Sequence, residues 1–133
     1  MVALEAWYDA DEGAVLIRTS DDLDSLLDRM VRDADAPVPP MAELFYRGSD
    51  GWAIAQAGIR ATAGRGFFAY ADPDGSVMTC DSGAAGSVEY DYMGNVREVP
   101  ASAEAPIAEG RRAAHEFLRT GSRPTCVEWQ PVK

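Results

Sequence analysis

The chain has 133 residues, of which 47% are hydrophobic and 26% are charged. This composition is typical of one globular domain covering residues 1–133, and it is unlike that of a disordered chain. Twelve basic residues stand against 22 acidic ones, so the formal net charge is −10. Such a surface repels nucleic-acid phosphates and anionic membranes and attracts a basic protein, although acidity alone can also serve only solubility.

The start of the chain and its cysteines indicate the compartment. Residues 1–8 contain no basic cluster and are interrupted by Glu5, so no secretory leader is expected. No apolar run approaches the roughly 18 residues that cross a membrane. We therefore expect a cytoplasmic protein, in which Cys80 and Cys126 lie in strands and are free and buried.

The first elements are a strand, a short apolar run and a helix. Residues 2–8 alternate weakly, and residues 14–18 form the apolar run. Thr19 is followed by acidic residues, which is typical of a helix N-cap. One apolar stripe then follows at helical spacing, formed by Leu23, Leu26, Leu27, Met30 and Val31. The proline-rich residues 36–40 end this helix.

From Met41 onward the pattern is one of strands joined by tight turns. Strands are predicted at residues 41–46, 52–59, 64–70, 76–80, 87–92 and 96–99. Residues 72–75 (DPDG) are a strong turn signal, and residues 47–51 and 81–86 are expected to be loops. This succession of turns favours an antiparallel sheet.

The last part of the sequence predicts a helix followed at once by a strand. The helix is expected at residues 103–120, with Pro106 in its first turn and Gly121 as its C-cap. Pro124 stops the helix, and residues 125–130 are predicted to form the closing strand. The fold class is therefore α+β: a mainly antiparallel sheet of about seven strands, with two helices packed on one face.

The sequence offers little that resembles an active site. His115 is the only histidine, and no second histidine follows it at the spacing of a zinc-protease helix. The 72–75 turn lacks the later ligands of a calcium loop. Cys80 or Cys126 would need a base that only His115 could supply. We therefore assign no catalytic, cofactor-binding or metal-binding residue.

Acidic side chains gather on the predicted hairpins. In residues 87–92 (SVEYDY), Val88, Tyr90 and Tyr92 share the face expected to be buried, while Glu89 and Asp91 point outward. Neighbouring turns and loops carry Asp72, Asp74 and Asp81. Simple solvation accounts for such a face, and so does recognition of a protein through carboxylates and an aromatic anchor. Residues 9–12 (DADE) are a second acidic patch.

The C-terminal pattern of Phe117, Thr120-Gly121, Pro124 and Trp129 resembles a signature of the deaminase-toxin immunity proteins of bacterial polymorphic toxin systems. A Gly51-Trp52 hairpin is a weaker match. These signature residues have cap, stop and core roles, so they indicate the family without forming its inhibitory surface.

The resemblance implies a non-enzymatic protein that binds and inhibits the catalytic domain of a cognate toxin. That partner would be a basic domain acting on nucleic acid, most commonly a DNA cytosine deaminase, and the immunity protein would be a monomer when free, binding neither nucleic acid nor membrane. The toxin-binding residues are then expected to be Asp72, Asp74, Asp81, Glu89, Asp91 and Trp52. The alternative is a small α+β enzyme or ligand-binding domain with an unrecognised pocket.

Overall fold

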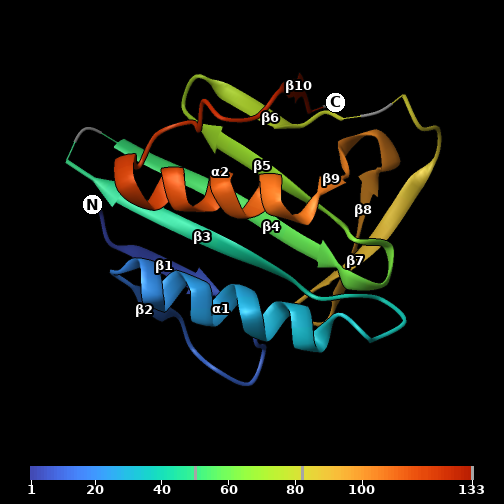
Figure 1. Ribbon diagram of the computed structural model, residues 1–133. Coiled ribbons are helices and arrows are strands. Elements are labelled where there is room, and N and C mark those ends of the chain that lie inside the picture. Colours follow the sequence, from blue (N-terminus) through green and yellow to red (C-terminus); the bar gives the residue numbers. More distant parts are fainter. Residues whose placement is uncertain (50, 82, 133) are drawn as a thin grey trace.

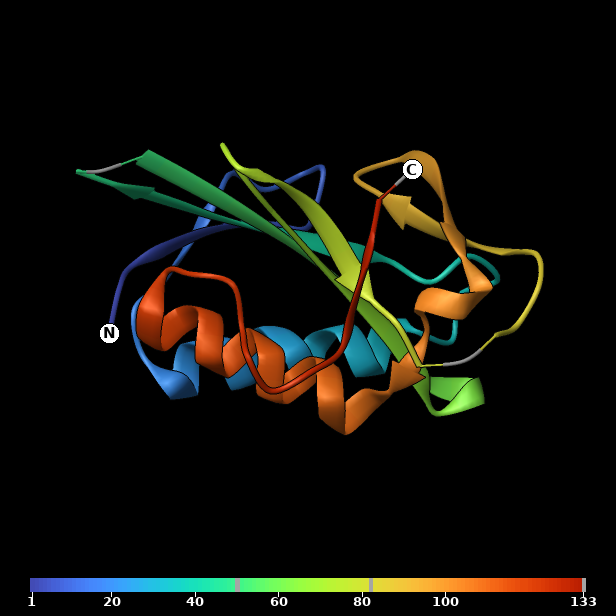
Figure 2. The same cartoon turned by 90° about the horizontal axis from the view of Figure 1, so that it is seen from above.

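A computed structural model describes residues 1–49, 51–81 and 83–132. Helices α1 and α2 lie side by side on one face of an eight-stranded sheet, and a two-stranded hairpin, β7–β8, lies over one end of the other face (Figures 1 and 2). The predicted α+β class, with antiparallel strands and both helices on one face, is confirmed. Two residues of the predicted loops, Asp50 and Ser82, lie outside the described residues.

The strands of the main sheet run in the order β10-β6-β5-β4-β3-β1-β2, with β9 paired to β5. The elements are β1 (Leu4–Trp7), β2 (Val15–Ile17), α1 (Ser20–Asp33), β3 (Met41–Gly48), β4 (Gly51–Arg60), η1 (Ala61–Ala63), β5 (Arg65–Asp72), β6 (Gly75–Thr79), β7 (Ser87–Tyr92), β8 (Asn95–Pro100), η2 (Ala101–Ala103), β9 (Ala105–Pro106), α2 (Ile107–Thr120) and β10 (Trp129–Pro131). Neither α-helix within these described ranges is long and apolar enough to cross a membrane.

Helix α1 begins with the predicted N-cap. The Thr19 hydroxyl accepts a hydrogen bond from the backbone N–H of Asp22, and the Asp22 carboxylate accepts one from the N–H of Thr19 in return. This reciprocal capping satisfies two backbone donors that a helix start otherwise leaves free. The apolar stripe packs on the sheet through Leu23, Leu26, Leu27 and Met30, whereas Val31 at its end is exposed.

Helix α2 packs beside α1 and ends as predicted. Gly121 adopts a left-handed conformation with φ 67°, and its N–H donates to the carbonyl of Phe117 over 2.7 Å. Phe117 is fully buried, with its ring edge-on to those of Phe68 and Tyr70. The Trp129 indole N–H donates to the carbonyl of Pro124 over 2.9 Å. The signature residues thus terminate the helix and fix the return of the chain to the sheet.

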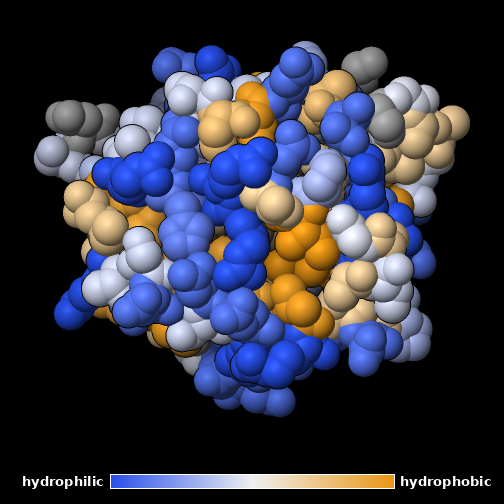
Figure 3. Space-filling model, viewed as in Figure 1, coloured by the Kyte–Doolittle hydropathy of each residue, from blue (hydrophilic) through white to orange (hydrophobic). Residues whose placement is uncertain are grey.

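The outer surface of the two helices is mostly hydrophilic, with an apolar area right of centre (Figure 3). Arg111 of α2 bridges to Asp24 and Asp28 of α1, at 3.0 and 3.2 Å, and so joins the two helices across their surface. This layer closes one face of the sheet.

A second, smaller core lies between the sheet and the β7–β8 hairpin. Tyr90 and Phe67 meet there with ring centroids 4.9 Å apart, and Met41 and Val99 pack around them. Val88 and Tyr92 pack against the same cluster, while Glu89 on the alternate side is exposed. The predicted inner and outer faces of β7 are therefore confirmed.

Three sequence-based predictions were wrong in detail. Helix α2 starts at Ile107 and not at residue 103, because Ala105–Pro106 pair with β5 as β9. The closing strand covers only Trp129–Pro131, instead of residues 125–130. Both cysteines are free, but Cys80 is half-buried just after β6 and Cys126 is exposed outside any strand.

Candidate functional site

The face of the sheet opposite the helices carries continuous rows of side chains. Strand register places one row across six strands, in the order Leu16, Glu5, Phe45, Ile54, Ala71 and Ser76. A parallel row contains Trp7, Glu43, Gln56, Ala69, Met78 and Gln130, and the pair Arg47–Trp52 lies beyond the first row. We call these residues together the open face.

The open face is more apolar than a solvent-facing sheet usually is. Trp52 is 42% exposed and Leu16 45% exposed, and Phe45 and Ile54 are partly exposed between them. Antiparallel sheets with one wet face normally place polar residues outward. The open face departs from this pattern at Phe45, Ile54 and Trp52.

A carboxylate lies in the floor of the open face. Glu43 accepts hydrogen bonds from the side-chain amide of Gln56 and from the hydroxyl of Tyr92, each over 3.0 Å. Burial, together with the charge of Glu43, raises the pKa of Tyr92 to about 12, so this hydroxyl stays protonated and donates. A hollow of about 270 Å³ opens beside Glu43, lined also by Trp52, Ile54, Ser76 and Val132.

The sequence-predicted acidic residues fall in three separate places. Asp72 and Asp74 lie at the β5–β6 turn, at the Trp52 end of the sheet, where Asp72 accepts hydrogen bonds from the Tyr70 hydroxyl and the Asp74 N–H. Asp81 forms an ion pair of 2.8 Å with Arg65. Asp72 and Asp74 therefore do not gather with the residues of β7, whereas the backbone N–H of Asp81 bonds to the carbonyl of Ser102 near the base of the hairpin.

Glu89 and Asp91 occupy the outer side of β7 over the other end of the sheet. The N–H of Asp91 donates to the carbonyl of Pro39, which ties β7 to the start of β3. Tyr90 packs on Phe67, which lies five residues before Asp72 on β5, a separation of roughly 16 Å at ~3.3 Å per residue. Glu89 stands directly opposite Glu98 across the hairpin.

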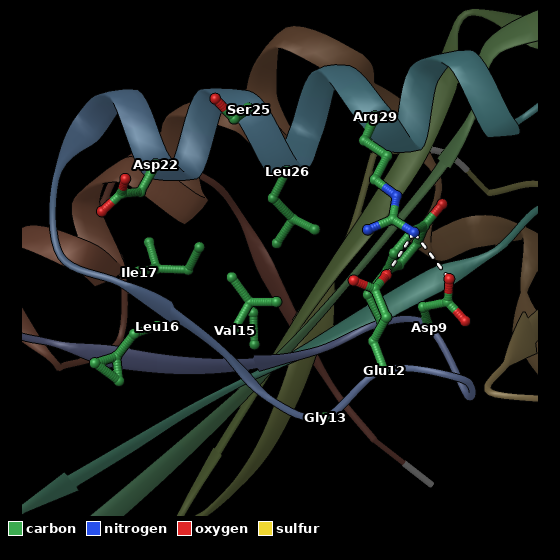
Figure 4. A pocket seen from close by; sticks show the side chains of 12 residues that line it. Asp9, Glu12, Gly13, Val15, Leu16, Ile17, Asp22, Ser25, Leu26 and Arg29 are labelled. Atoms are coloured by element: carbon green, nitrogen blue, oxygen red, sulfur yellow. Dashed lines mark hydrogen bonds and ion pairs between the residues drawn. The ribbon is translucent and has the colours of Figure 1, made fainter.

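The acidic N-terminal patch borders a second hollow, of about 230 Å³, between α1 and the β1–β2 loop (Figure 4). Its apolar wall includes Val15, Ile17 and Leu26. At its rim, Arg29 contacts Asp9 and Glu12 at 2.9 and 2.8 Å, as the dashed lines in Figure 4 show. The two carboxylates are therefore already paired within the chain.

Glu104 is a buried carboxylate that sequence analysis did not single out. It is 3% exposed, and its carboxylate accepts hydrogen bonds from the Arg60 guanidinium and from the Tyr90 hydroxyl, at 3.0 and 2.8 Å. Burial alone would raise its pKa, but the hydrogen bonds from Arg60 and Tyr90 outweigh burial and lower it. This fully satisfied cluster joins β4, β7 and η2, and so has a structural role.

The described residues do not assemble a recognisable catalytic group. His115 bonds to Asp24 over 2.8 Å between the helices. Burial and the neighbouring Glu116 raise the pKa of Cys126, which disfavours a thiolate nucleophile there. Within the described ranges, three or more potential metal ligands do not cluster anywhere.

The fold defines an α+β domain in which two helices cover one face of the main sheet and the hairpin β7–β8 covers one end of the other face. Residues 11–131 match the family model of the immunity protein Imm1, and the chain therefore belongs to the Imm1 immunity protein family. The prediction of an immunity protein is confirmed at this level, and a toxin partner follows from it. No curated protein matches the chain.

Proposed function

We propose that this protein binds the catalytic domain of a cognate nucleic-acid deaminase toxin that acts on DNA cytosine. It inhibits the toxin in the cytoplasm and does not itself catalyse a reaction. The observation that carries the proposal is the family match over residues 11–131. The net charge of −10 supports the choice of target. A deaminase that holds DNA presents positive charge near its site, and an acidic inhibitor competes for that surface.

The dispersed acidic residues contribute to this competition by steering the two proteins together. Asp74 and Glu89 are exposed on different hairpins, so each adds to the long-range field whatever the final contact. Asp72, Asp81 and Asp91 have partners inside the chain and contribute less to direct contacts. Steering of this kind raises the association rate and weakens with salt.

Co-expression with the catalytic domain of a cognate toxin tests the proposal. The two proteins are expected to co-purify as a complex, and the complex is expected to have lost deaminase activity on a cytosine-containing DNA oligonucleotide. A matched sample with an unrelated acidic protein of similar charge controls for non-specific neutralisation. Full deamination in the presence of excess immunity protein would refute inhibition.

A further inference from the structure

We infer that the toxin's catalytic domain docks on the open face, with Trp52 and Ile54 as apolar anchors and Glu43 receiving a basic side chain of the toxin. This inference rests on the proposed function for the identity of the partner. It differs from the sequence-based assignment, in which carboxylates on the hairpins make the contact.

The first argument is the composition of the open face. Trp52, Ile54 and Phe45 lie adjacent across β3 and β4, where Phe45 pairs with Ile54 and Arg47 with Trp52. The Arg47 guanidinium lies 4.9 Å from the centre of the Phe45 ring. Tryptophan and arginine are the residues most enriched at the energetic centres of protein interfaces. Large apolar groups with a few polar groups between them match the core of such interfaces.

The second argument is charge complementarity at Glu43. This half-buried carboxylate has two neutral hydrogen-bond donors, Gln56 and Tyr92, and forms no ion pair with a described residue. A lysine or arginine entering the adjacent hollow would supply the missing positive charge, and partial burial would strengthen that contact. A basic nucleic-acid-binding domain carries such side chains around its site.

The third argument is that other surfaces of the described chain are less suited to docking. The edge strands β2 and β10 have only three residues each, and Pro131 lacks an N–H donor, so strand addition has little backbone to pair with. The helices cover the opposite face of the sheet. At the N-terminal hollow, Arg29 already neutralises Asp9 and Glu12.

The open face is also fixed before the partner arrives. Eight residue pairs join β3 to β4, from Met41 with Gly58 to Gly48 with Gly51. Seven more pairs join β4 to β5. Because the backbone under Trp52 and Ile54 is held by this ladder, docking loses little conformational entropy.

The test is a titration of the purified chain with the toxin's catalytic domain, followed by isothermal calorimetry. We expect W52A to raise Kd by at least ~30-fold, the range of an interface hot spot. S76R adds a bulky side chain to the hollow and removes no core group, and it should weaken binding similarly. V96A is the matched control, because Val96 is 58% exposed on the outer side of β8 and should change Kd less than ~3-fold.

The outcomes separate the inference from the proposed function. Near-native affinity of W52A and S76R, combined with loss of binding on reversing charges at Asp74 and Glu89, would overturn docking on the open face and leave the proposed function standing. Absence of any wild-type complex would overturn both. Chemical denaturation of each variant shows whether it folds, and S76R is the decisive variant if W52A does not.

Discussion

The two faces of the central sheet are built from the same strands but have different compositions and different neighbours. On the helix face, Leu44, Ala55 and Phe68 are buried under α1 and α2. On the open face, the alternate residues Phe45 and Ile54 remain partly exposed. Because side chains alternate along a strand, neighbouring positions can serve stability and binding separately. Substitutions on the two faces should therefore have separable effects.

The largest expected effect is on the helix face. Phe117→Ala removes a fully buried ring between Phe68 and Tyr70 and should lower the free energy of unfolding by ~3–5 kcal/mol. Urea denaturation measures this loss. W52A is the counterpart on the open face and should cost less than ~1 kcal/mol, since Trp52 is 42% exposed and belongs to neither core cluster. Equal losses for the two variants would contradict the division between the faces.

A somewhat smaller effect is expected at the buried cluster under the β7–β8 hairpin. Glu104→Gln removes the charge that faces Arg60 and should destabilise by ~2–3 kcal/mol, toward the low side for a buried pair because Arg60 reaches solvent.

This cluster also predicts a dependence on pH. The folded pKa of Glu104 is lowered, so the unfolded chain binds its proton more readily than the folded chain. The stabilisation from Glu104 is therefore complete above the ordinary glutamate pKa and is lost as the pH falls through the lower, folded pKa. Denaturation curves from neutral to acidic pH should show a steeper loss for wild type than for E104Q, and parallel curves would be inconsistent with this role.

Gly58→Ala probes the part of the same sheet face that the β7–β8 hairpin covers. An added methyl group would lie 2.5 Å from the Phe67 ring and 2.6 Å from the Tyr90 ring, so both must move. We expect a loss of ~1–3 kcal/mol by overpacking. Gly13→Ala, with open space around its added methyl, is the control. If G58A lowers the free energy of unfolding by less than G13A does, the hairpin accommodates the added methyl group without loss of stability.

The smallest effect should come from the outer side of the hairpin. Glu98→Lys turns the directly opposed pair Glu89–Glu98 into opposite charges and should stabilise the protein by ~0.2–1 kcal/mol. Thermal unfolding at low and high salt measures this gain, which should shrink as salt rises. At high salt, the E98K variant should bind the toxin with the same affinity as the wild type. A large loss of affinity under these conditions would place the hairpin in the contact.

Local signals in the sequence were sufficient for much of the fold. The Thr19 cap, the Leu23 to Met30 stripe and the Gly121 stop all depend on residues within a few positions of one another, and each was predicted. The start of α2 was not predicted, because it is set by pairing with β5 and by the burial of Glu104 against Arg60, both far apart in sequence.

The open face was beyond the reach of sequence reasoning for the same reason. Along β3, Glu43, Phe45 and Arg47 alternate with Ala42, Leu44 and Tyr46, and both sets contain apolar residues, so the pattern does not indicate which side is covered. Which set is covered is decided by where α1, α2 and the β7–β8 hairpin pack on the sheet. Trp52 was assigned to toxin binding from sequence, and this remains a prediction.

The net charge of −10 has a consequence for the protein while it is alone. An uncovered apolar sheet face favours aggregation, because two copies can associate through it. Because every copy carries the same sign of charge, copies repel one another over ~10 Å at 0.1 M salt and over only ~3 Å at 1 M. The same field draws a basic partner inward. The negative charge thus disfavours self-association and favours association with a basic protein, so that the open face can stay uncovered until the toxin binds.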